Sequence, residues 1–215
     1  MPEVQRSGGD ADKGQKGELQ PLKIKCTSTD CGNGLHCFKR TQQMIKENRG
    51  GVCRACGASL VDWKRLRARD LGDTDYTFEA LKFEMIRHHF WHKVLDEKAV
   101  LHARRKGRLL LREAAENRLR KYVGPAEPSY DGRQTPMSGN TIFYAQHATA
   151  TCCRKCLQEW YGIPLGVALT EEQIAYFTEL VMRYISERLP DLKDEPERIP
   201  SRSVPSRRRP SIATT

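Results

Sequence analysis

The sequence predicts a mainly α-helical protein, with a minor β contribution, that carries a zinc-ribbon-like module of four cysteine ligands near its N-terminus. Two observations support this class. Apolar residues recur at three- and four-residue steps over several stretches after residue 77, as in helices that bury one face. The eight cysteines form two groups, five between Cys26 and Cys56 and three between Cys152 and Cys156. Clustered thiols in a reducing compartment usually hold metal.

Composition limits the location and the partners. The chain has 37 Lys and Arg against 27 Asp and Glu, a formal charge of +10, which favours anionic partners such as nucleic acid, acidic protein or lipid headgroups. No stretch approaches the roughly 18 apolar residues of a membrane helix, and the first residues lack the apolar core of a signal peptide. We therefore expect a cytoplasmic protein with no membrane partner.

The chain divides into four predicted segments. Residues 1–22 are rich in Gly, Lys and Asp without a hydrophobic period, so we expect a disordered tail there. A zinc-binding module is predicted for residues 23–64, and a helical domain that contains the second cysteine cluster for residues 65–192. Residues 193–215, with four prolines and a run of three arginines, are expected to form a basic disordered tail.

The first module has the residues of a zinc site. Cys53 and Cys56 are separated by two residues and are followed by a glycine, which is typical of a zinc knuckle. A structural zinc needs four ligands, and we assign the other two to Cys26 and Cys31, which bracket a short turn; Cys37 is the alternative. A redox Cys-x-x-Cys pair would follow a strand and begin a helix, whereas this pair is flanked by glycines and turns.

Helices are predicted in order along the rest of the chain. The first begins near Thr77, and the second covers about 111–122 after a bend or break at Gly107. Turn residues dominate the following segment, in which Ile142 to Tyr144 are expected to form a short strand. The last helix begins after Thr170, which forms a capping box with Gln173, and its apolar stripe is interpreted as core.

Two motifs in the C-terminal half are distinctive. DGRQTPM at 131–137 and AQHATATCCRKC at 145–156 resemble an uncharacterised family, domain of unknown function number 4186. The resemblance extends from about Phe90 to Leu189. This family has no established activity, so the resemblance supports a site without naming its function. It also implies a histidine upstream, after an aromatic residue, which we place at His92; His88 and His89 are the alternatives.

A second zinc ion is predicted at this cluster. We assign its ligands to His92, His147, Cys153 and Cys156, which offer the soft nitrogen and sulfur donors of a tetrahedral site. Cys152 is the alternative to one of the thiols. The competing interpretation is a buried, hydrogen-bonded His147 beside structural thiols.

The chemical criteria favour a binding protein over an enzyme, and no catalytic residue is assigned. A zinc deaminase is disfavoured because His147 is followed by Ala148 and Thr149, without the glutamate of the His-x-Glu motif. A zinc hydrolase or nuclease using His147, Cys153 and Cys156 is the alternative; it needs a carboxylate, and Asp131 is the candidate. Cys152 as a nucleophile is a further alternative.

The most basic structured segment runs from Arg104 to Lys121, with eight Lys or Arg against two Glu. Phosphate contacts from such a helix would give salt-dependent binding without base readout. We therefore predict a zinc-binding protein that associates with nucleic acid, against the alternatives of a solvated helix face and of a zinc-held subunit that binds a partner protein. The candidate contact residues are Arg104, Arg105, Lys106, Arg108 and Arg112.

Overall fold

The computed structural model describes residues 24–130 and 132–199. Within these ranges it has eight α-helices and two short 3-10 helices, and its β structure consists of two isolated bridges, Asp30 with Leu35 and His36 with Glu84. The predicted mainly α-helical class is confirmed. The predicted tail of residues 1–22 lies outside the described residues, as do residues 200–215 of the predicted C-terminal tail.

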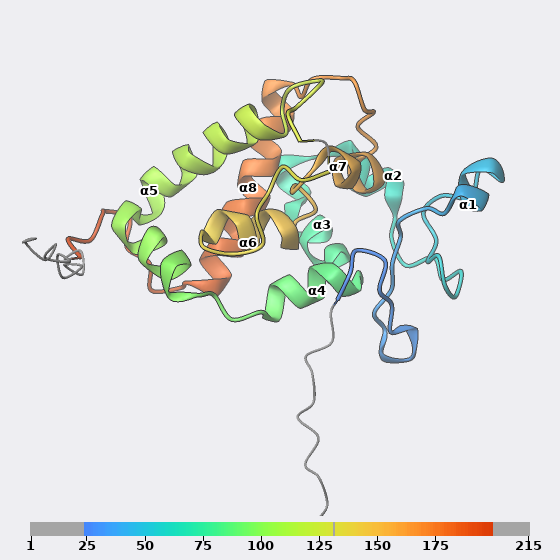
Figure 1. Cartoon of the computed structure of the whole chain (residues 1–215), viewed down its shortest axis with the longest axis horizontal. Coiled ribbons are helices and arrows are strands. Elements are labelled where there is room, and N and C mark those ends of the chain that lie inside the picture. Colours follow the sequence, from blue (N-terminus) through green and yellow to red (C-terminus); the bar gives the residue numbers. More distant parts are fainter. Residues whose placement is uncertain (1–23, 131, 200–215) are drawn as a thin grey trace, which may run out of the picture.

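Residues 24–68 contain little regular structure. Their elements are η1 (Cys31–Asn33), α1 (Gln42–Lys46) and α2 (Trp63–Ala68). The two helices begin at capping side chains, because Thr41 accepts a hydrogen bond from the backbone N–H of Met44 and Asp62 accepts one from Arg65. Figure 1 shows α1 at one end of the molecule and α5 at the other.

The longer helices gather around α8 (Glu171–Arg188), which lies in the middle of the helical part (Figure 1). Its neighbours are α3 (Thr74–Leu81), which follows η2 (Leu71–Asp73), α5 (Glu97–Tyr122) and α6 (Thr141–Ala148). On the outer side, α4 (Met85–His92) packs on α6, and α7 (Arg154–Tyr161) packs on α2. The capping box of Thr170 with Gln173 is confirmed, and the apolar stripe of α8 is buried in the core.

An aromatic cluster attaches the N-terminal part to the helices. The rings of Phe38 and Trp63 lie 5.7 and 5.3 Å from the ring of Trp160 in α7, between centroids. The backbone of His36 also bonds to the residues just before and at the start of α4: its N–H donates to Phe83 O (2.7 Å) and its carbonyl accepts from Met85 N (2.8 Å). The first cysteine module is thus held directly against α4 and α7.

A break interrupts α5 at Gly107, as the sequence predicted. This glycine has φ 67° and ψ 172°, a conformation that side chains oppose. The N–H groups of Arg108 and Leu109 therefore lose their partners in the preceding turn, and they donate instead to the carbonyls of Lys193 and Asp194, at 2.8 and 3.3 Å. The C-terminal segment after α8 closes the break.

The predicted strand at Ile142 to Tyr144 is wrong, because these residues begin α6. Asn140 starts this helix by accepting a hydrogen bond from the N–H of Ile142 at 2.8 Å. The helix is buried on most of its sides between α4, α5 and α8. Its sequence therefore lacks the polar face by which an exposed helix is recognised.

None of the helices in the described part of the chain has both the length and the apolar character that crossing a bilayer requires.

Candidate metal centres

The first cluster, which we call centre 1, contains Cys31, His36, Cys53 and Cys56, whose ligand atoms all lie within 4.8 Å of one another. The Sγ atoms of Cys31 and Cys53 are 3.7 Å apart, and Cys56 Sγ lies 3.4 Å from His36 Nδ1. Zinc bonds of 2.3 Å to sulfur and 2.0–2.1 Å to nitrogen, at tetrahedral angles, require about 3.8 Å between two sulfurs and about 3.6 Å between sulfur and nitrogen. The cluster has the size of a zinc coordination sphere.

Two turns bring these four residues together. Gly34, with φ 74°, follows η1 and allows the chain to return, so that Asp30 pairs with Leu35 and His36 comes back to Cys31. The second turn is the knuckle, in which Gly57 donates its N–H to Cys53 O at 2.9 Å while adopting φ 76°. Both turns depend on a glycine in the left-handed conformation, which only a residue without Cβ adopts freely.

Hydrogen bonds make one thiol of centre 1 acidic while the next resists ionisation. Burial opposes ionisation of Cys53, but hydrogen bonds from backbone groups of Cys37, Cys56 and Ala55 lower the pKa of its thiol to about 6. Burial and the neighbouring thiols raise the pKa of Cys31 to about 11. A bound cation would remove this repulsion and allow all the thiols to ionise, which is how metal binding displaces protons.

Three of the four predicted ligands, Cys31, Cys53 and Cys56, meet in centre 1, and His36 rather than Cys26 is the fourth member. Cys37, the predicted alternative, is buried but belongs to neither cluster. Its Sγ donates a hydrogen bond to the carbonyl of Cys26 at 3.3 Å. Neighbouring side chains in an extended segment point to opposite sides. This alternation is the signal that could have separated His36 from Cys37.

The second cluster, centre 2, contains the three thiols of Cys152, Cys153 and Cys156, all within 4.8 Å of one another. The Sγ atoms of Cys152 and Cys156 are 3.5 Å apart. Cys153 is the N-cap of α7, and Cys156 lies in the first turn of that helix. Centre 2 therefore sits at the positive end of the α7 dipole, which favours ionised thiols.

A buried arginine from α4 faces these thiols. Arg87 donates from Nη2 to Cys156 Sγ at 3.1 Å and approaches Cys152 Sγ with Nη1 at 3.8 Å. Hydrogen bonds from Cys152 and Cys153, aided by the charge of Arg87 against the cost of burial, lower the pKa of the Cys156 thiol well below its usual value. The guanidinium thus stabilises negative charge on centre 2.

Arg87 is itself paired with a buried carboxylate. Its Nε donates to Glu84 Oε2 at 2.9 Å, and both side chains are only 3% exposed. The same carboxylate accepts from Trp160 Nε1 at 2.8 Å and from the N–H of Phe38 at 3.4 Å. Burial raises the pKa of Glu84, and the positive charge of Arg87 opposes this increase. Glu84 therefore connects the two centres, because its side chain bonds to Arg87 beside centre 2 and its backbone forms the bridge to His36 of centre 1.

His147 and His92, the predicted histidine ligands, are not in the three-thiol cluster. His147 is buried, stacks on Phe90 at 4.4 Å between ring centroids, and places Nε2 3.1 Å from the carbonyl of Pro136. Burial, with the nearby charge of Arg87, lowers its pKa to about 4. Its ring does line a cavity of about 380 Å³ together with the three thiols and Cys26. This matches the competing interpretation of a buried, hydrogen-bonded histidine.

His92 lies elsewhere because of its position on α4. It is two residues after Phe90, about 200° around the helix, and its Nδ1 lies 2.9 Å from the carbonyl of His88. It lines a separate hollow with Ile24 and Leu35. The face of α4 that carries Arg87 and Phe90 is the one that meets centre 2.

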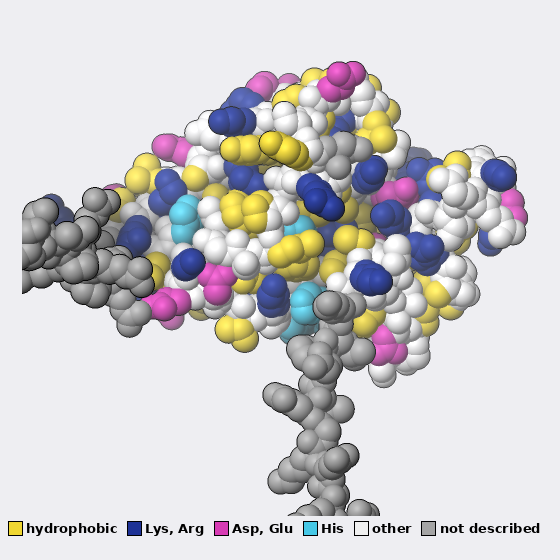
Figure 2. All heavy atoms as spheres, viewed as in Figure 1, with side chains coloured by type: hydrophobic (Ala, Val, Ile, Leu, Met, Phe, Trp, Pro, Cys, Tyr) yellow, Lys and Arg dark blue, Asp and Glu magenta, His cyan; other side chains and the backbone are white. Residues whose placement is uncertain are grey.

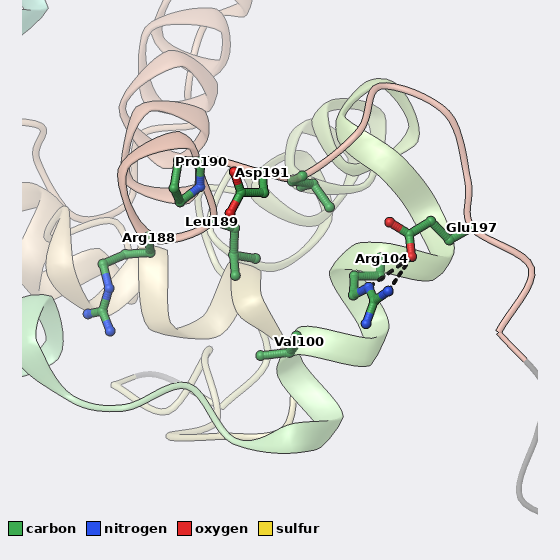
Figure 3. A pocket seen from close by; sticks show the side chains of 8 residues that line it. Val100, Arg104, Arg188, Leu189, Pro190, Asp191 and Glu197 are labelled. Carbon is green, nitrogen blue, oxygen red and sulfur yellow. Dashed lines mark hydrogen bonds and ion pairs between the residues drawn. The ribbon is translucent and has the colours of Figure 1, made fainter.

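Three of the five basic residues predicted to contact nucleic acid are already paired with acids. Arg104 pairs with Glu197 at 2.6 Å, Arg108 with Asp194 at 3.4 Å and Arg112 with Glu179 at 2.8 Å. Among the described residues Arg105 and Lys106 form no ion pair. Figure 3 shows the pair of Arg104 with Glu197 beside a cavity of about 300 Å³ between α5 and the C-terminal segment. In Figure 2, basic side chains are scattered over the visible face, with acidic and hydrophobic ones between them.

Where the structure describes them, the groups considered for catalysis are engaged with neighbouring side chains. Asp131 lies outside the described residues. Glu84, the carboxylate next to centre 2, is occupied by Arg87 and Trp160. Hydrogen bonding with Cys153 and Cys156 raises the pKa of the Cys152 thiol well above its usual value, with burial adding to the effect, so this thiol is a poor nucleophile.

Comparison with known proteins agrees with the motifs. No solved structure matches the chain. A family model described as a domain of unknown function, DUF4186, matches residues 75–186, which include all of centre 2 with Glu84 and Arg87 and exclude centre 1. This range is a little more than half of the chain. The resemblance seen in the sequence is confirmed, and the chain belongs to the DUF4186 family.

Proposed function

We propose that this protein is a zinc-binding protein in which centre 1 holds a structural zinc ion through Cys31, His36, Cys53 and Cys56. The observation that carries the proposal is the pair of distances in this cluster, 3.7 Å between two sulfurs and 3.4 Å between sulfur and nitrogen. Both are close to the separations that a tetrahedral zinc ion imposes. Three thiolates and one imidazole complete the coordination sphere, as in structural sites.

The surroundings of centre 1 support a structural role. Few side chains of residues 24–62 are buried, so this part has little apolar core from which to gain folding energy. His36 belongs to the cluster and also pairs through its backbone with residues 83 and 85. A zinc ion bound to His36 would therefore fix the module against α4.

The other predicted functions gain less from the geometry. Nucleic-acid association through α5 would have to proceed although Arg104, Arg108 and Arg112 are engaged by carboxylates. A hydrolase at centre 2 would need a free carboxylate, and Glu84 is held by two donors. A zinc-held scaffold that presents a fixed surface to a partner protein needs neither unpaired arginines on α5 nor a free carboxylate at centre 2. We therefore prefer this function to nucleic-acid association and to hydrolysis.

Zinc analysis of the full-length protein tests the proposal. Cys53→Ser and Cys56→Ser are each expected to lose one zinc equivalent, while Cys37→Ser, which removes a thiol in neither cluster, keeps the wild-type content. His36→Ala should behave like the two cysteine variants. Unchanged zinc in Cys56→Ser, or a wild-type protein whose melting temperature is the same with and without a chelator, would refute a structural zinc at centre 1.

A further inference from the structure

Centre 2 has three thiols in mutual reach, and among the residues that the structure describes no fourth His, Cys, Asp or Glu ligand lies within the same distance. Three buried or half-buried thiols can lose their protons when a cation binds, and a tetrahedral zinc ion held by three thiolates takes one more donor. The cavities that border the cluster show which side chains can supply it. The candidates are Cys26 and His147, because both line the larger cavity with the three thiols.

We propose that Cys26 is the fourth ligand, so that Cys26, Cys152, Cys153 and Cys156 hold a second zinc ion between the N-terminal segment and α7. Cys26 lines both cavities next to centre 2, the one of about 380 Å³ and a smaller one of about 110 Å³. Arg87, Cys153 and Cys156 line the smaller cavity together with it. This inference does not rest on the zinc proposed at centre 1.

His147 is the poorer donor for this metal. Its ring is fixed by stacking on Phe90, and its Nε2 already faces the carbonyl of Pro136. The ring donates that hydrogen bond from Nε2 and keeps its lone pair on Nδ1, but no ring nitrogen of His147 lies within 4.8 Å of all three sulfurs, and the stacking and this bond oppose the rotation that would bring Nδ1 closer. Cys26 is exposed and lies in a turn closed by a bond from Ser28 N to Lys25 O. Coordination requires only that this surface turn move toward α7.

The charges around centre 2 suit a four-thiolate site. Four thiolates and one Zn²⁺ carry a net charge of −2, which a protein interior tolerates when donors and cations surround the sulfurs. Arg87 supplies the positive charge and two N–H groups directed at Cys156 and Cys152. Lys39 and Lys155 line the smaller cavity beside Cys26, as do Glu84 and Glu159, whose charges are paired with Arg87 and Arg40. The N-terminus of α7 adds its dipole.

The assignment would connect the two centres along the chain. Cys26 and Cys31 are five residues apart, and under this proposal each holds a different metal ion. A metal at centre 2 would restrain the segment that carries a ligand of centre 1, and the reverse would also hold because coupling between two binding sites is reciprocal. The N-terminal module would then be fastened at two points, on α4 and on α7.

The test uses full-length protein loaded with ¹¹³Cd²⁺ or Zn²⁺, with metal content and the ¹¹³Cd NMR spectrum as readouts. The wild type is expected to bind two equivalents and to give two signals, because a four-sulfur site is more deshielded than a site of three sulfurs and one nitrogen. Cys26→Ser should shift or remove only the signal of the sulfur-rich site and weaken that site at least tenfold. The matched control, Cys37→Ser, should leave both signals in place.

Each other outcome is decisive. If Cys26→Ser keeps two equivalents and both signals, or if His147→Gln removes the second signal instead, Cys26 is not the ligand. A wild type that binds one equivalent, lost in Cys56→Ser, would overturn centre 2 as a metal site and leave the zinc at centre 1 intact. A protein that binds no metal would overturn both.

Discussion

The buried pair of Glu84 and Arg87 allows a quantitative prediction, by the substitution Glu84→Gln. Glutamine has nearly the same size and keeps one oxygen that can accept from Trp160, so packing changes little. The carboxylate charge is lost, however, and Arg87 is left without its carboxylate partner in an interior where both side chains are 3% exposed. Removing one partner of such a pair costs about 3–5 kcal/mol, because the other charge stays buried.

A matched control is available at the surface. Glu159 pairs with Arg40 at 3.1 Å, and these side chains are 16% and 32% exposed. Partly exposed pairs of this kind contribute about 0–1 kcal/mol. In a chain of this length each kcal/mol shifts the melting temperature by about 2–4 °C. Glu84→Gln should therefore lower the melting temperature by roughly 6–20 °C, and Glu159→Gln by less than about 4 °C.

Thermal unfolding followed by tryptophan fluorescence, at a fixed excess of zinc, measures both variants under the same metal saturation. Trp160 lies beside Glu84, so its emission reports the region that is perturbed. A melting temperature for Glu84→Gln within the range of the Glu159→Gln control would refute the reasoning. It would mean that the thiolates of centre 2, rather than Glu84, balance the charge of Arg87.

Two further predictions concern the break in α5 and the buried histidine. Gly107→Ala should lower the free energy of unfolding in urea by more than Gly139→Ala does. Both positions have positive φ, where a side chain costs about 1–3 kcal/mol, but only at Gly107 would the new Cβ overlap the backbone of Asp194 and Glu195. Equal losses in the two variants would show that the C-terminal segment does not pack on the break. Burial, aided by the charge of Arg87, lowers the pKa of His147 to about 4, below its usual 6.5. On acidification, His147 is therefore protonated in the unfolded chain before it is protonated in the folded chain. Neutral His147 contributes about 3 kcal/mol to the free energy of unfolding, which is fully present above pH 6.5 and is lost as the pH falls through 4. An NMR titration of the ring with a midpoint near 6.5 would contradict this.

The sequence predicted those parts of the fold whose signals are local. The Thr170 capping box and the apolar stripe of α8 lie on one partly exposed helix, so pattern alone identifies them. Gly107 was predicted to mark a break because glycine destabilises the interior of a helix. The helix α6 was missed, because seven of its eight residues are buried and no polar face marks the period.

The centres were predicted as far as spacing along the chain allows. Cys53 and Cys56 follow from a two-residue interval, and so do Cys153 and Cys156. The places of His36 and Cys26 did not follow from such an interval, because the first depends on a turn and the second on how the N-terminal segment docks. The turn at Gly34 returns His36 to Cys31 in centre 1. The docking of the N-terminal segment leaves Cys26 beside a cavity that Cys156 also lines, over a hundred positions away.

The return of the C-terminal segment to the break at Gly107 bears on where the protein can be shortened. The family match stops at residue 186, yet the carbonyls that receive the N–H groups of Arg108 and Leu109 belong to residues 193 and 194, and Glu197 bonds back to the carbonyl of Arg104. A fragment trimmed to the family boundaries would leave the middle of its longest helix without these acceptors. Expression boundaries should therefore extend at least to residue 199.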